Sequence, residues 1–395
     1  MMDIVIAHFG TYYVGMPGGV EKVTCNLANA MIQKGHQVTI LYRDSKEGSP
    51  YFSLDTHVAQ HNILFENGVK RISEKLPWAL RAEREVKRIF SQNSAQAVNA
   101  KYKGQQYGPA IQKWLEKLQP DVVLSCSIPS TKYVIEDAGY IGPLVTMIHA
   151  DPDVQFSRLS EIEQRAAAKS TVMQLLLPSA LEVARRYFPN LPMEVIGNAV
   201  FPAVKMADLK SDKPKYVISC VGNICERKNQ KLLVHAFSHL MEEFPQWKLE
   251  LWGRCTSPYA VHLIREIHRK GWDSRIFVKG ETNHVDDIYA YSDIFALLSH
   301  HEGFGLAVAE AMSAGVPAVG LKSCFGINDL ILHQKTGFLC DENSKDIENK
   351  LKLLMKNRNL RMYMGTNGRI MINEYEPNKI WEKWNDLFMR MISQS

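Results

Sequence analysis

Two doubly wound α/β domains, each built on a parallel sheet, are predicted for this chain by three observations. Its 395 residues exceed the roughly 250–300 that one hydrophobic core serves. Short apolar runs alternate with longer amphipathic runs in both halves of the chain. A polar stretch with two prolines, residues 201–215, separates the halves and is predicted to be a linker.

The first domain is predicted to span residues 1–200 and to open with a strand–helix–strand unit. Apolar residues recur at helical spacing between Val20 and Met31, and Gly35 is a helix stop signal. Several strand-like runs are continuously apolar, as expected for parallel strands covered on both faces. These runs are residues 3–9, 37–43, 121–126, 144–149 and 173–177.

The second domain is predicted to span residues 216–375 and repeats the pattern, with helical stretches such as 229–244 between its strands. Its strand-like runs are residues 216–222, 248–253, 275–280, 293–299, 317–321 and 337–341. Residues 376–395 form an amphipathic pattern that predicts a C-terminal helix, which could pack back on the first domain. Ligands of such sheets bind outside the carboxyl ends of the strands, and the cleft between two such domains is the expected site.

Composition excludes several classes of protein. A net charge of +5 is too mild to favour nucleic-acid binding. Seven cysteines with no CxxC pair favour reduced thiols over disulfides or a zinc site. The N-terminus lacks the features of a signal peptide, and no run approaches the roughly 18–20 apolar residues of a membrane span. These features predict a cytoplasmic protein whose contact with a membrane, on its inner face, would be peripheral.

Two loops of the first domain are candidate binding elements. The glycine-rich loop from Gly10 to Lys22 follows the first strand and suits phosphate through exposed amides, or it is a plain turn, since it matches neither GxGxxG nor a P-loop. The motif HADPD, residues 149–153, follows the fourth strand. His149 is a candidate functional histidine or a core residue. Asp151 and Asp153 suit either a divalent ion or the cap of the next helix.

Two loops of the second domain carry charge. Arg227 and Lys228 follow the first strand and could neutralise a pyrophosphate. Glu302 and Glu310 flank a Gly-Phe-Gly turn. Eight residues of straight helix span about 12 Å, more than the roughly 5–9.5 Å of a hydrolytic carboxylate pair. Glu302 also precedes the helix, so two separate contacts to one extended ligand are favoured over an acid/base pair.

These residues resemble a known family. The run EGFGLAVAE resembles the E-x7-E signature of the retaining glycosyltransferases of family 4, which have the GT-B fold. The opening GGVEKVTCNLANAMIQKGHQVTILY, the IGNAV before the linker and the late FGINDLILHQKTGFLC resemble other segments of that family. One residue departs from the pattern, because the family often has Gly-Arg where this chain has Gly222-Asn223. Arg227 could replace the missing arginine.

The resemblance implies that the second domain binds a nucleotide sugar, with UDP-sugar the expected donor and a hexose the expected sugar. It implies catalytic roles for His149, Glu302 and Lys228, with Glu302 on the sugar and Glu310 on the ribose. The substrate-binding residues that it implies are Gly18, Gly19, Asn223, Arg227, Lys228, Gly303, Phe304, Gly305, Leu306, Ala307 and Glu310. It implies neither a bound metal nor another cofactor. The acceptor would be a saccharide or a lipid-linked saccharide of cell-surface polysaccharide, lipopolysaccharide or glycan assembly.

One amphipathic stretch, residues 75–90, suits two environments. Trp78, Val86 and Ile89 recur at helical spacing with basic residues between them. Such a helix could touch an anionic membrane, while a surface helix packed on the first domain is the favoured alternative.

Two other functions compete with sugar transfer: a nucleotide-sugar epimerase on the same fold, and a partner subunit without activity. The intact His149, Lys228, Glu302 and Glu310 argue against the inactive subunit.

Overall fold

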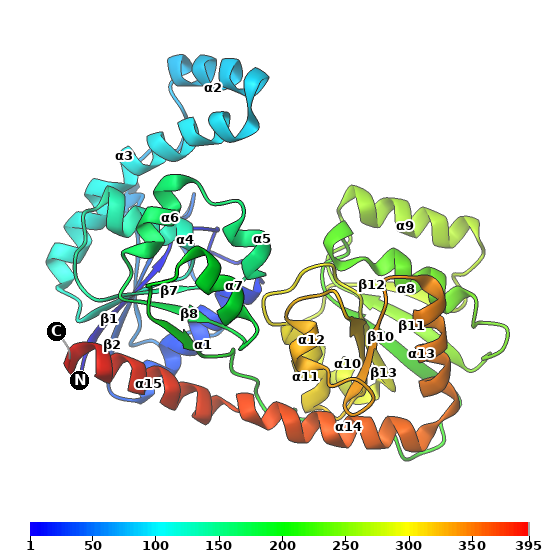
Figure 1. Ribbon diagram of the computed structural model, residues 1–395. Helices are drawn as coiled ribbons and strands as arrows, with labels where there is room; N and C mark the ends of the chain where they lie inside the picture. The colour runs from blue at the N-terminus through cyan, green and yellow to red at the C-terminus, as the bar shows by residue number, and fades with distance from the viewer. Residues whose placement is uncertain (394–395) are drawn as a thin grey trace. The chain divides into compact units, whose positions relative to one another are not determined.

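The computed structural model describes residues 1–393, apart from the side chains of Gln92, Asn93, Ser94 and Gln96. The chain forms two compact units, each described here by itself. Unit 1 comprises Met1–Ile196 together with the C-terminal residues from Trp381, and unit 2 comprises Gly197–Ile380. Each unit contains one parallel sheet with helices against it (Figure 1), which confirms the predicted α/β class.

The sheet of unit 1 has seven strands in the order β3-β2-β1-β6-β7-β8-β9, and every neighbouring pair is parallel. Its strands are β1 (Asp3–His8), β2 (Gln37–Tyr42), β3 (Ala59–Asn62), β6 (Val122–Ser125), β7 (Leu144–Met147), β8 (Val172–Leu175) and β9 (Met193–Val195). A two-stranded antiparallel pair, β4 (Phe65–Glu66) and β5 (Val69–Lys70), lies outside this sheet. The strand order reverses between β1 and β6, so their carboxyl ends mark the crevice where ligands of such sheets bind.

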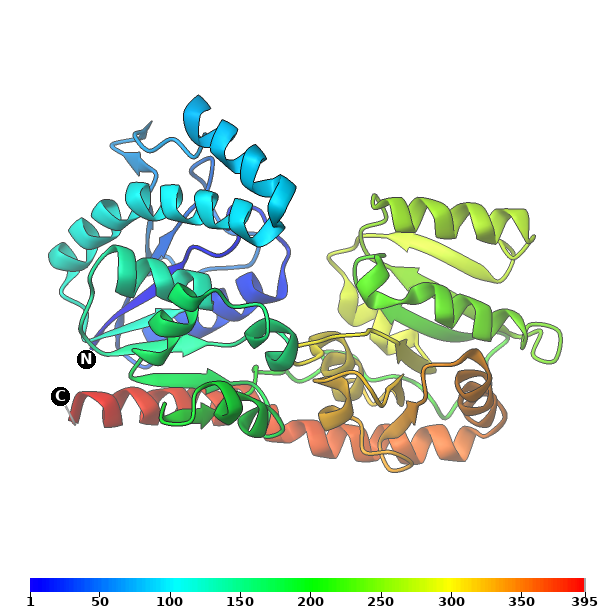
Figure 2. The ribbon, with the colours of Figure 1, turned by 45° about the horizontal axis from the view of Figure 1, so that its top comes forward.

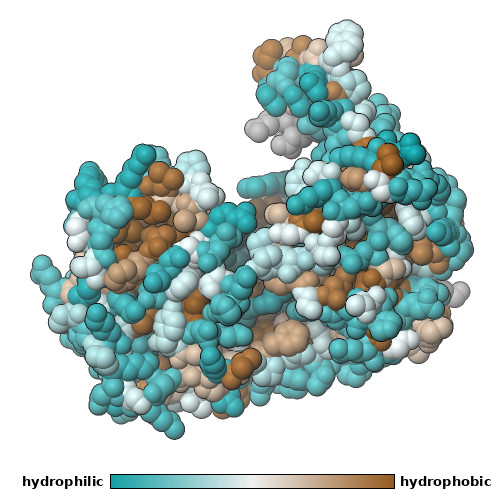
Figure 3. Space-filling model, turned by 180° about the vertical axis from the view of Figure 1, so that it is seen from behind, coloured by the Kyte–Doolittle hydropathy of each residue, from teal (hydrophilic) through white to brown (hydrophobic). Residues whose placement is uncertain are grey.

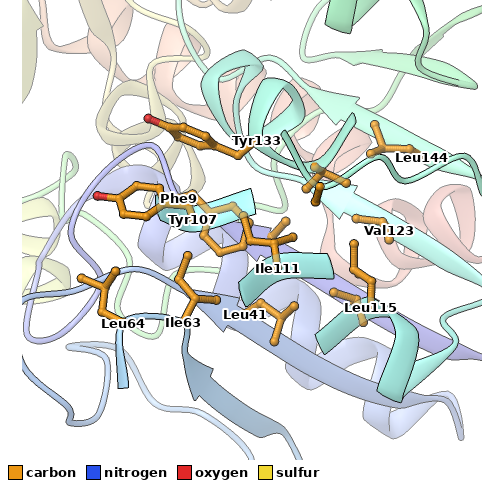
Figure 4. Packing of buried hydrophobic residues seen from close by; sticks show 14 residues of the cluster. Phe9, Leu41, Ile63, Leu64, Tyr107, Ile111, Leu115, Val123, Tyr133 and Leu144 are labelled. Atoms are coloured by element: carbon orange, nitrogen blue, oxygen red, sulfur yellow. The ribbon is translucent and has the colours of Figure 1, made fainter. Parts of the chain in front are cut away.

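The helices of unit 1 connect these strands. They are α1 (Gly19–Gln33), α2 (Trp78–Phe90), α3 (Gln92–Leu118), α4 (Ile128–Lys132), the π-helical turn η1 (Tyr133–Asp137), α5 (Pro152–Phe156), α6 (Glu161–Ala168) and α7 (Ala180–Tyr187). Helix α3 covers one face of the sheet (Figure 2). Its residues Tyr107 and Ile111 are buried against Leu41 of β2 and Val123 of β6 (Figure 4). Burial of each such side chain stabilises the fold by about 1.5–3 kcal/mol, which holds the strand ends rigidly.

Unit 2 has a six-stranded parallel sheet in the order β12-β11-β10-β13-β14-β15. Its strands are β10 (Tyr216–Val221), β11 (Trp247–Trp252), β12 (Ile276–Gly280), β13 (Ile294–Leu297), β14 (Ala318–Leu321) and β15 (Gly337–Cys340). Its helices are η2 (Glu226–Lys228), α8 (Gln230–Ser238), α9 (Pro258–Arg269), α10 (Val285–Tyr291), α11 (Leu306–Ser313), α12 (Ile327–Leu330), α13 (Ser344–Lys356), α14 (Arg358–Ile372) and η3 (Asn373–Tyr375). The order reverses between β10 and β13, which brings the loops after these two strands together.

The stretch predicted as a linker, residues 201–215, packs within unit 2. The amide of Ala203 donates to Ser313 Oγ at 3.0 Å, and the amide of Ala207 donates to the carbonyl of Ala314 at 2.9 Å. Leu209 is buried. The segment therefore covers the C-terminal end of α11. Its largely polar composition gives no indication that Leu209 is buried there. Helix α8 ends at Ser238, earlier than the predicted 229–244, and turns follow it.

The last helix, α15 (Pro377–Ser393), crosses the boundary between the units. Its part in unit 1 buries Trp384, Leu387 and Phe388. Polar contacts fix this part of the helix beside the end of α1: Lys34 Nζ lies 2.6 Å from Glu382 Oε1, and His36 Nε2 lies 3.0 Å from Asn385 Oδ1. The predicted amphipathic pattern thus corresponds to a buried face.

Helix α2 lies against α3 at the outer end of that helix, away from the sheet (Figure 1). None of its residues is buried. Trp78 is 83% exposed and Ile89 is 80% exposed. Figure 3 shows brown apolar atoms among teal polar atoms over this projecting hairpin. The favoured expectation is a surface helix packed on the first domain, and α2 does pack on α3 of unit 1, but its apolar side chains Trp78, Val86 and Ile89 are exposed. Among the described residues, no helix is long and apolar enough to cross a membrane.

Candidate active site

The loops after β10 and β13 form the most highly charged part of the candidate site in unit 2. Lys228 Nζ lies 2.7 Å from Glu302 Oε1, and Arg227 Nη1 lies 3.0 Å from the same oxygen. Arg227 Nη1 also donates to the carbonyl of His301 at 2.9 Å, and the amide of His300 donates to the carbonyl of Arg227 at 2.9 Å. Arg227 and Glu302, which are 75 positions apart in the sequence, are thus in direct contact. Two cations contact the same carboxylate oxygen, Oε1 of Glu302.

Burial and charge act in opposite directions on Glu302. The Lys228 and Glu302 side chains are only 12% and 11% exposed. Burial raises the pKa of Glu302, but the positive charges of Lys228 and Arg227 outweigh burial and hold its pKa below the usual value. This contribution to stability is present above the unfolded pKa and is lost as the pH falls through the folded one. The cluster is therefore charged at neutral pH.

The backbone at Gly222 leaves room for the lysine. Gly222 has φ of +151°, and the Lys228 side chain passes where a Cβ at this position would contact it. The carbonyl of Asn223 accepts a hydrogen bond from Gln230 Nε2 at 3.0 Å, and the Asn223 side chain is exposed. The chain lacks an arginine at position 223, and Arg227 supplies the second cation of the cluster.

The Gly-Phe-Gly turn is built around a buried ring. Phe304 is 2% exposed, and its ring meets that of Tyr375 edge to face at 4.9 Å. Any contact between the turn and a ligand must therefore come from the backbone of Gly303 and Gly305, since the ring points into the protein. Gly305 has φ of +83°, a left-handed conformation that favours glycine. Its position as the N-cap lets the chain turn sharply into α11.

Helix α11 begins at Leu306, and the first amides of a helix have no acceptor within the helix. The amides of Val308 and Ala309 both bond to the carbonyl of Gly305, at 2.9 and 3.1 Å. The amides of Leu306 and Ala307 precede these and lie at the positive end of the helix. The first turn of α11 contains no acidic residue. This helix start is therefore suited to an anion.

Glu310 lies one turn further along α11 and has a partner that the sequence pattern does not reveal. The Tyr289 hydroxyl of α10 donates to Glu310 Oε2 at 2.9 Å. Glu310 itself is partly exposed. The two glutamates of the motif thus have different environments. Glu302 is paired with two cations, and Glu310 accepts a hydrogen bond from the Tyr289 hydroxyl.

The glycine loop of unit 1 leads into α1, where Gly18 is the N-cap and Gly19 the first residue. Glu21, in the first turn, is buried, and its carboxylate lies against Gly18 so closely that a Cβ there would collide with it. Thr11 Oγ1 donates to Glu21 Oε1 at 2.7 Å, and His8 Nε2 lies 3.3 Å from the same oxygen. A carboxylate of the chain itself already faces this helix start.

His149 follows β7, two residues beyond its end. Burial lowers the pKa of His149 to about 4, and the neighbouring His8 adds to this effect. Its Nε2 is buried without a hydrogen-bond partner among the described residues. The HADPD aspartates serve structure: Asp151 caps α5 by accepting from the amide of Asp153 at 3.0 Å, and the Asp153 carboxylate lies 3.5 Å from Arg186.

The structure joins some of the predicted residues and separates the roles of others. Arg227, Lys228 and Glu302 form one cluster beside the turn and the start of α11. Tyr289 was missed, because a tyrosine in an amphipathic helix gives no signal of its own. Glu21 was missed as well, although a glutamate next to Gly18 and Gly19 could have suggested that their helix start is already occupied.

Two family models match the chain in succession. The model described as Glycosyltransferase Family 4 matches residues 17–202, and the model described as Glycosyl transferases group 1 matches residues 203–371. The chain is a glycosyltransferase. Over 390 residues it is 25% identical to an uncharacterized glycosyltransferase of Haemophilus influenzae, covering 95% of this chain and 97% of that protein. A relative in Staphylococcus aureus, named for capsular polysaccharide biosynthesis, is 25% identical over 185 residues, 46% of this chain and 47% of that protein.

Solved structures show the fold of this glycosyltransferase. Sucrose-phosphate synthase from Thermosynechococcus elongatus superposes with a TM-score of 0.77 at 16% identity, covering 100% of both chains. TarM of S. aureus, in a complex with UDP and α-GlcNAc-glycerol, superposes with a TM-score of 0.75 at 16% identity, covering 98% of this chain and 100% of that chain. The predicted GT-B architecture is confirmed.

Proposed function

We propose that this glycosyltransferase moves a hexose, with retention of configuration, from a UDP-sugar to a saccharide or lipid-linked saccharide acceptor in cell-surface glycan assembly. The observation that carries the proposal is the cluster of Lys228, Arg227 and Glu302 beside the start of α11, whose first turn contains no acidic residue. The TarM complex contains UDP, which supports the choice of nucleotide. The capsular polysaccharide relative supports the kind of product.

Leaving-group stabilisation is the proposed task of the cations. When the bond between the anomeric carbon and the phosphate oxygen breaks, negative charge grows on the nucleoside diphosphate. Lys228, Arg227 and the amides of Leu306 and Ala307 would stabilise that charge. In the structure, Glu302 holds both cations in place. A diphosphate would then compete with Glu302 for Lys228. The Glu302 carboxylate would be left able to accept hydrogen bonds from hydroxyl groups of the sugar.

Retention is proposed to occur by attack on the same face of the sugar. The acceptor oxygen forms the new bond to the anomeric carbon as the phosphate leaves, and a phosphate oxygen of the donor takes the acceptor proton. This step needs no protein nucleophile. Its bonds and protons balance without a cofactor. His149, which its lowered pKa keeps neutral near pH 7, is proposed to hydrogen-bond the reacting sugar rather than to carry charge.

A panel of nucleotide sugars, each offered with and without saccharide acceptors, tests the function. Transfer predicts release of nucleoside diphosphate that depends on the acceptor, and a product whose anomeric proton signal matches the donor's configuration. An isomerised donor without an acceptor would instead show an epimerase, which no relative named above favours. An inverted product would reject retention alone.

Unit 1 is proposed to contact an anionic membrane through α2. Trp78, Ile89 and Phe90 are each at least 80% exposed, and the helix carries four basic residues, three of them paired with its two glutamates. Exposed apolar side chains beside cations are the features of helices that lie in the headgroup region of a bilayer. A lipid-linked acceptor would be presented at such a surface.

Co-sedimentation with vesicles tests this contact. The enzyme is expected to sediment with vesicles that contain about a third phosphatidylglycerol and to do so less at high salt. The substitution Phe90→Glu should abolish sedimentation. Ile141→Glu is the matched control, because Ile141 is also in unit 1 and is 99% exposed. Equal sedimentation of both variants, or none by the unsubstituted enzyme, would reject the contact.

A further inference from the structure

Helix α10 brings a buried tyrosine to the second glutamate of the motif. Tyr289 is 2% exposed, and its ring meets Phe295 of β13 edge to face at 5.8 Å. This packing leaves the ring little freedom to rotate away. Its hydroxyl donates to Glu310 Oε2 at 2.9 Å. The position of one carboxylate oxygen is thus coupled to the sheet through a rigid side chain.

We propose that Tyr289 is the positioning residue that orients the Glu310 carboxylate toward the ribose of the donor. The inference rests on the proposed function, in which Glu310 binds the ribose hydroxyls. A carboxylate has about four acceptor sites, so the bond from Tyr289 leaves it able to accept from a vicinal diol. Without that bond the carboxylate would lose one restraint on its last side-chain torsion, which is broad and soft.

The hydroxyl is suited to be a permanent donor. Burial raises the pKa of Tyr289 well above its ordinary value, and the charge of Glu310 raises it further. The proton therefore stays on the phenol at neutral pH. A tyrosine in this position fixes the direction of the carboxylate while leaving its negative charge in place.

A second tyrosine of α10 provides a matched control. The Tyr291 hydroxyl donates to Glu250 Oε2 at 2.8 Å. Glu250 is a buried residue of β11 that Lys248 and Trp252 also contact. Both tyrosines thus donate to a carboxylate from the same helix, but only Tyr289 reaches a residue of the E-x7-E stretch. A loss caused by general weakening of α10 would affect both variants alike.

The experiment is calorimetric titration of the full chain with UDP and with inorganic pyrophosphate. Tyr289→Phe is expected to raise the Kd for UDP about 3–10-fold and to leave the Kd for pyrophosphate, which has no ribose, unchanged. Tyr291→Phe should change neither. In a Glu310→Ala background, Tyr289→Phe should have no further effect on UDP, because the oriented group is gone.

The possible results separate the inference from the function on which it rests. If Glu310→Ala weakens UDP but Tyr289→Phe does not, Tyr289 has no positioning role. Equal weakening of UDP and pyrophosphate by Tyr289→Phe would show a merely structural role and would also reject the inference. If Glu310→Ala leaves UDP binding unchanged, the proposed ribose contact itself fails.

Discussion

The helices α1 and α11 both start at a glycine after a strand, yet their first turns differ in charge. At α1, the chain places Glu21 against Gly18, and Thr11 and His8 hold its carboxylate. At α11, the first turn contains no acid, and two cations from the loop after β10, Arg227 and Lys228, pair with Glu302 on the loop that precedes the helix. The positive end of α1 is thus neutralised by the protein, while that of α11 remains available.

In the proposed function, this difference assigns phosphate binding to the start of α11 rather than to that of α1. Phosphate binding needs backbone donors and positive charge, and of these two helix starts it is α11 that has two cations nearby and no acid in its first turn. The α1 end offers a carboxylate and histidines, which suit hydroxyl groups rather than phosphates. Gly19, one of the expected substrate-binding residues, is therefore a weaker candidate for binding a pyrophosphate through its amide than Leu306 and Ala307. Each of the following experiments tests this division.

The largest effect is expected for Lys228→Ala. Removing a preorganised cation from the leaving group should lower kcat about 10²–10³-fold, with a smaller change in the KM for donor. Lys248→Ala is the control, because Lys248 is also a lysine of unit 2 paired with a buried glutamate, Glu250. Steady-state kinetics with the donor found in the panel would check it. A kcat within threefold of the unsubstituted enzyme would remove Lys228 from the chemistry.

The next largest effect is expected when a glutamate is placed in the first turn of α11, as Glu21 is in the first turn of α1. Ala307→Glu places an acid in the first turn, where it would repel a diphosphate and occupy the amides. The Kd for UDP should rise at least about 10-fold, equivalent to about 1.4 kcal/mol. Ala307→Gln, of similar size but neutral, should raise it much less. If both variants bind UDP equally, size rather than charge determines binding at this helix start.

Much of this site follows from the order of residues, but its pairings do not. The Gly-Phe-Gly turn, the start of α11 near Gly305 and the cations after β10 are local features, and sequence spacing predicts where they lie. The convergence of Arg227 and Lys228 on Glu302 depends on β10 lying next to β13, which is a property of the sheet order. Phe304 illustrates the same limit, since its partner Tyr375 is distant in sequence.

Two segments outside the site show what a sequence pattern leaves undetermined. The stretch 201–215 has the polar composition of a linker, and its packing depends on Leu209 and on backbone hydrogen bonds that composition does not encode. In α2 the amphipathic pattern predicted the helix correctly. The pattern could not tell whether its apolar face meets the core or the solvent, because that depends on where α3 directs the hairpin.

Glycine substitutions at the two helix starts should have moderate effects with different causes. Gly305→Ala should destabilise unit 2 by about 1–2 kcal/mol, since a residue with a Cβ is strained at φ of +83°. Gly18 has φ of −88°, which alanine adopts readily, so Gly18→Ala should be harmful only through its contact with Glu21.

Thermal unfolding of single and double variants separates these causes. Adding Glu21→Ala should remove the further loss of stability caused by Gly18→Ala, measured relative to Glu21→Ala alone. The loss of stability caused by Gly305→Ala should stay the same when Glu21→Ala is added, because it comes from backbone strain and not from a contact with Glu21. An additive result for Gly18→Ala and Glu21→Ala would show that the carboxylate does not lie against Gly18.

The smallest effect concerns His149 and the acid side of the stability profile. In the folded chain the pKa of His149 is lowered to about 4. Between about pH 6.5 and 4 the imidazole is therefore protonated in the unfolded chain but neutral in the folded chain. Stability due to His149 is therefore complete at pH 7 and falls as the pH decreases. Replacing His149 by Gln should reduce the drop in Tm between pH 7 and pH 5 by about 2–6 °C, which corresponds to about 1–2 kcal/mol.

His57→Gln, at a histidine whose side chain is 80% exposed in the same unit, should leave that drop unchanged. An identical pH profile for the His149 variant would mean that the imidazole is not held neutral by burial, and a charged histidine would then have to be considered beside Glu21.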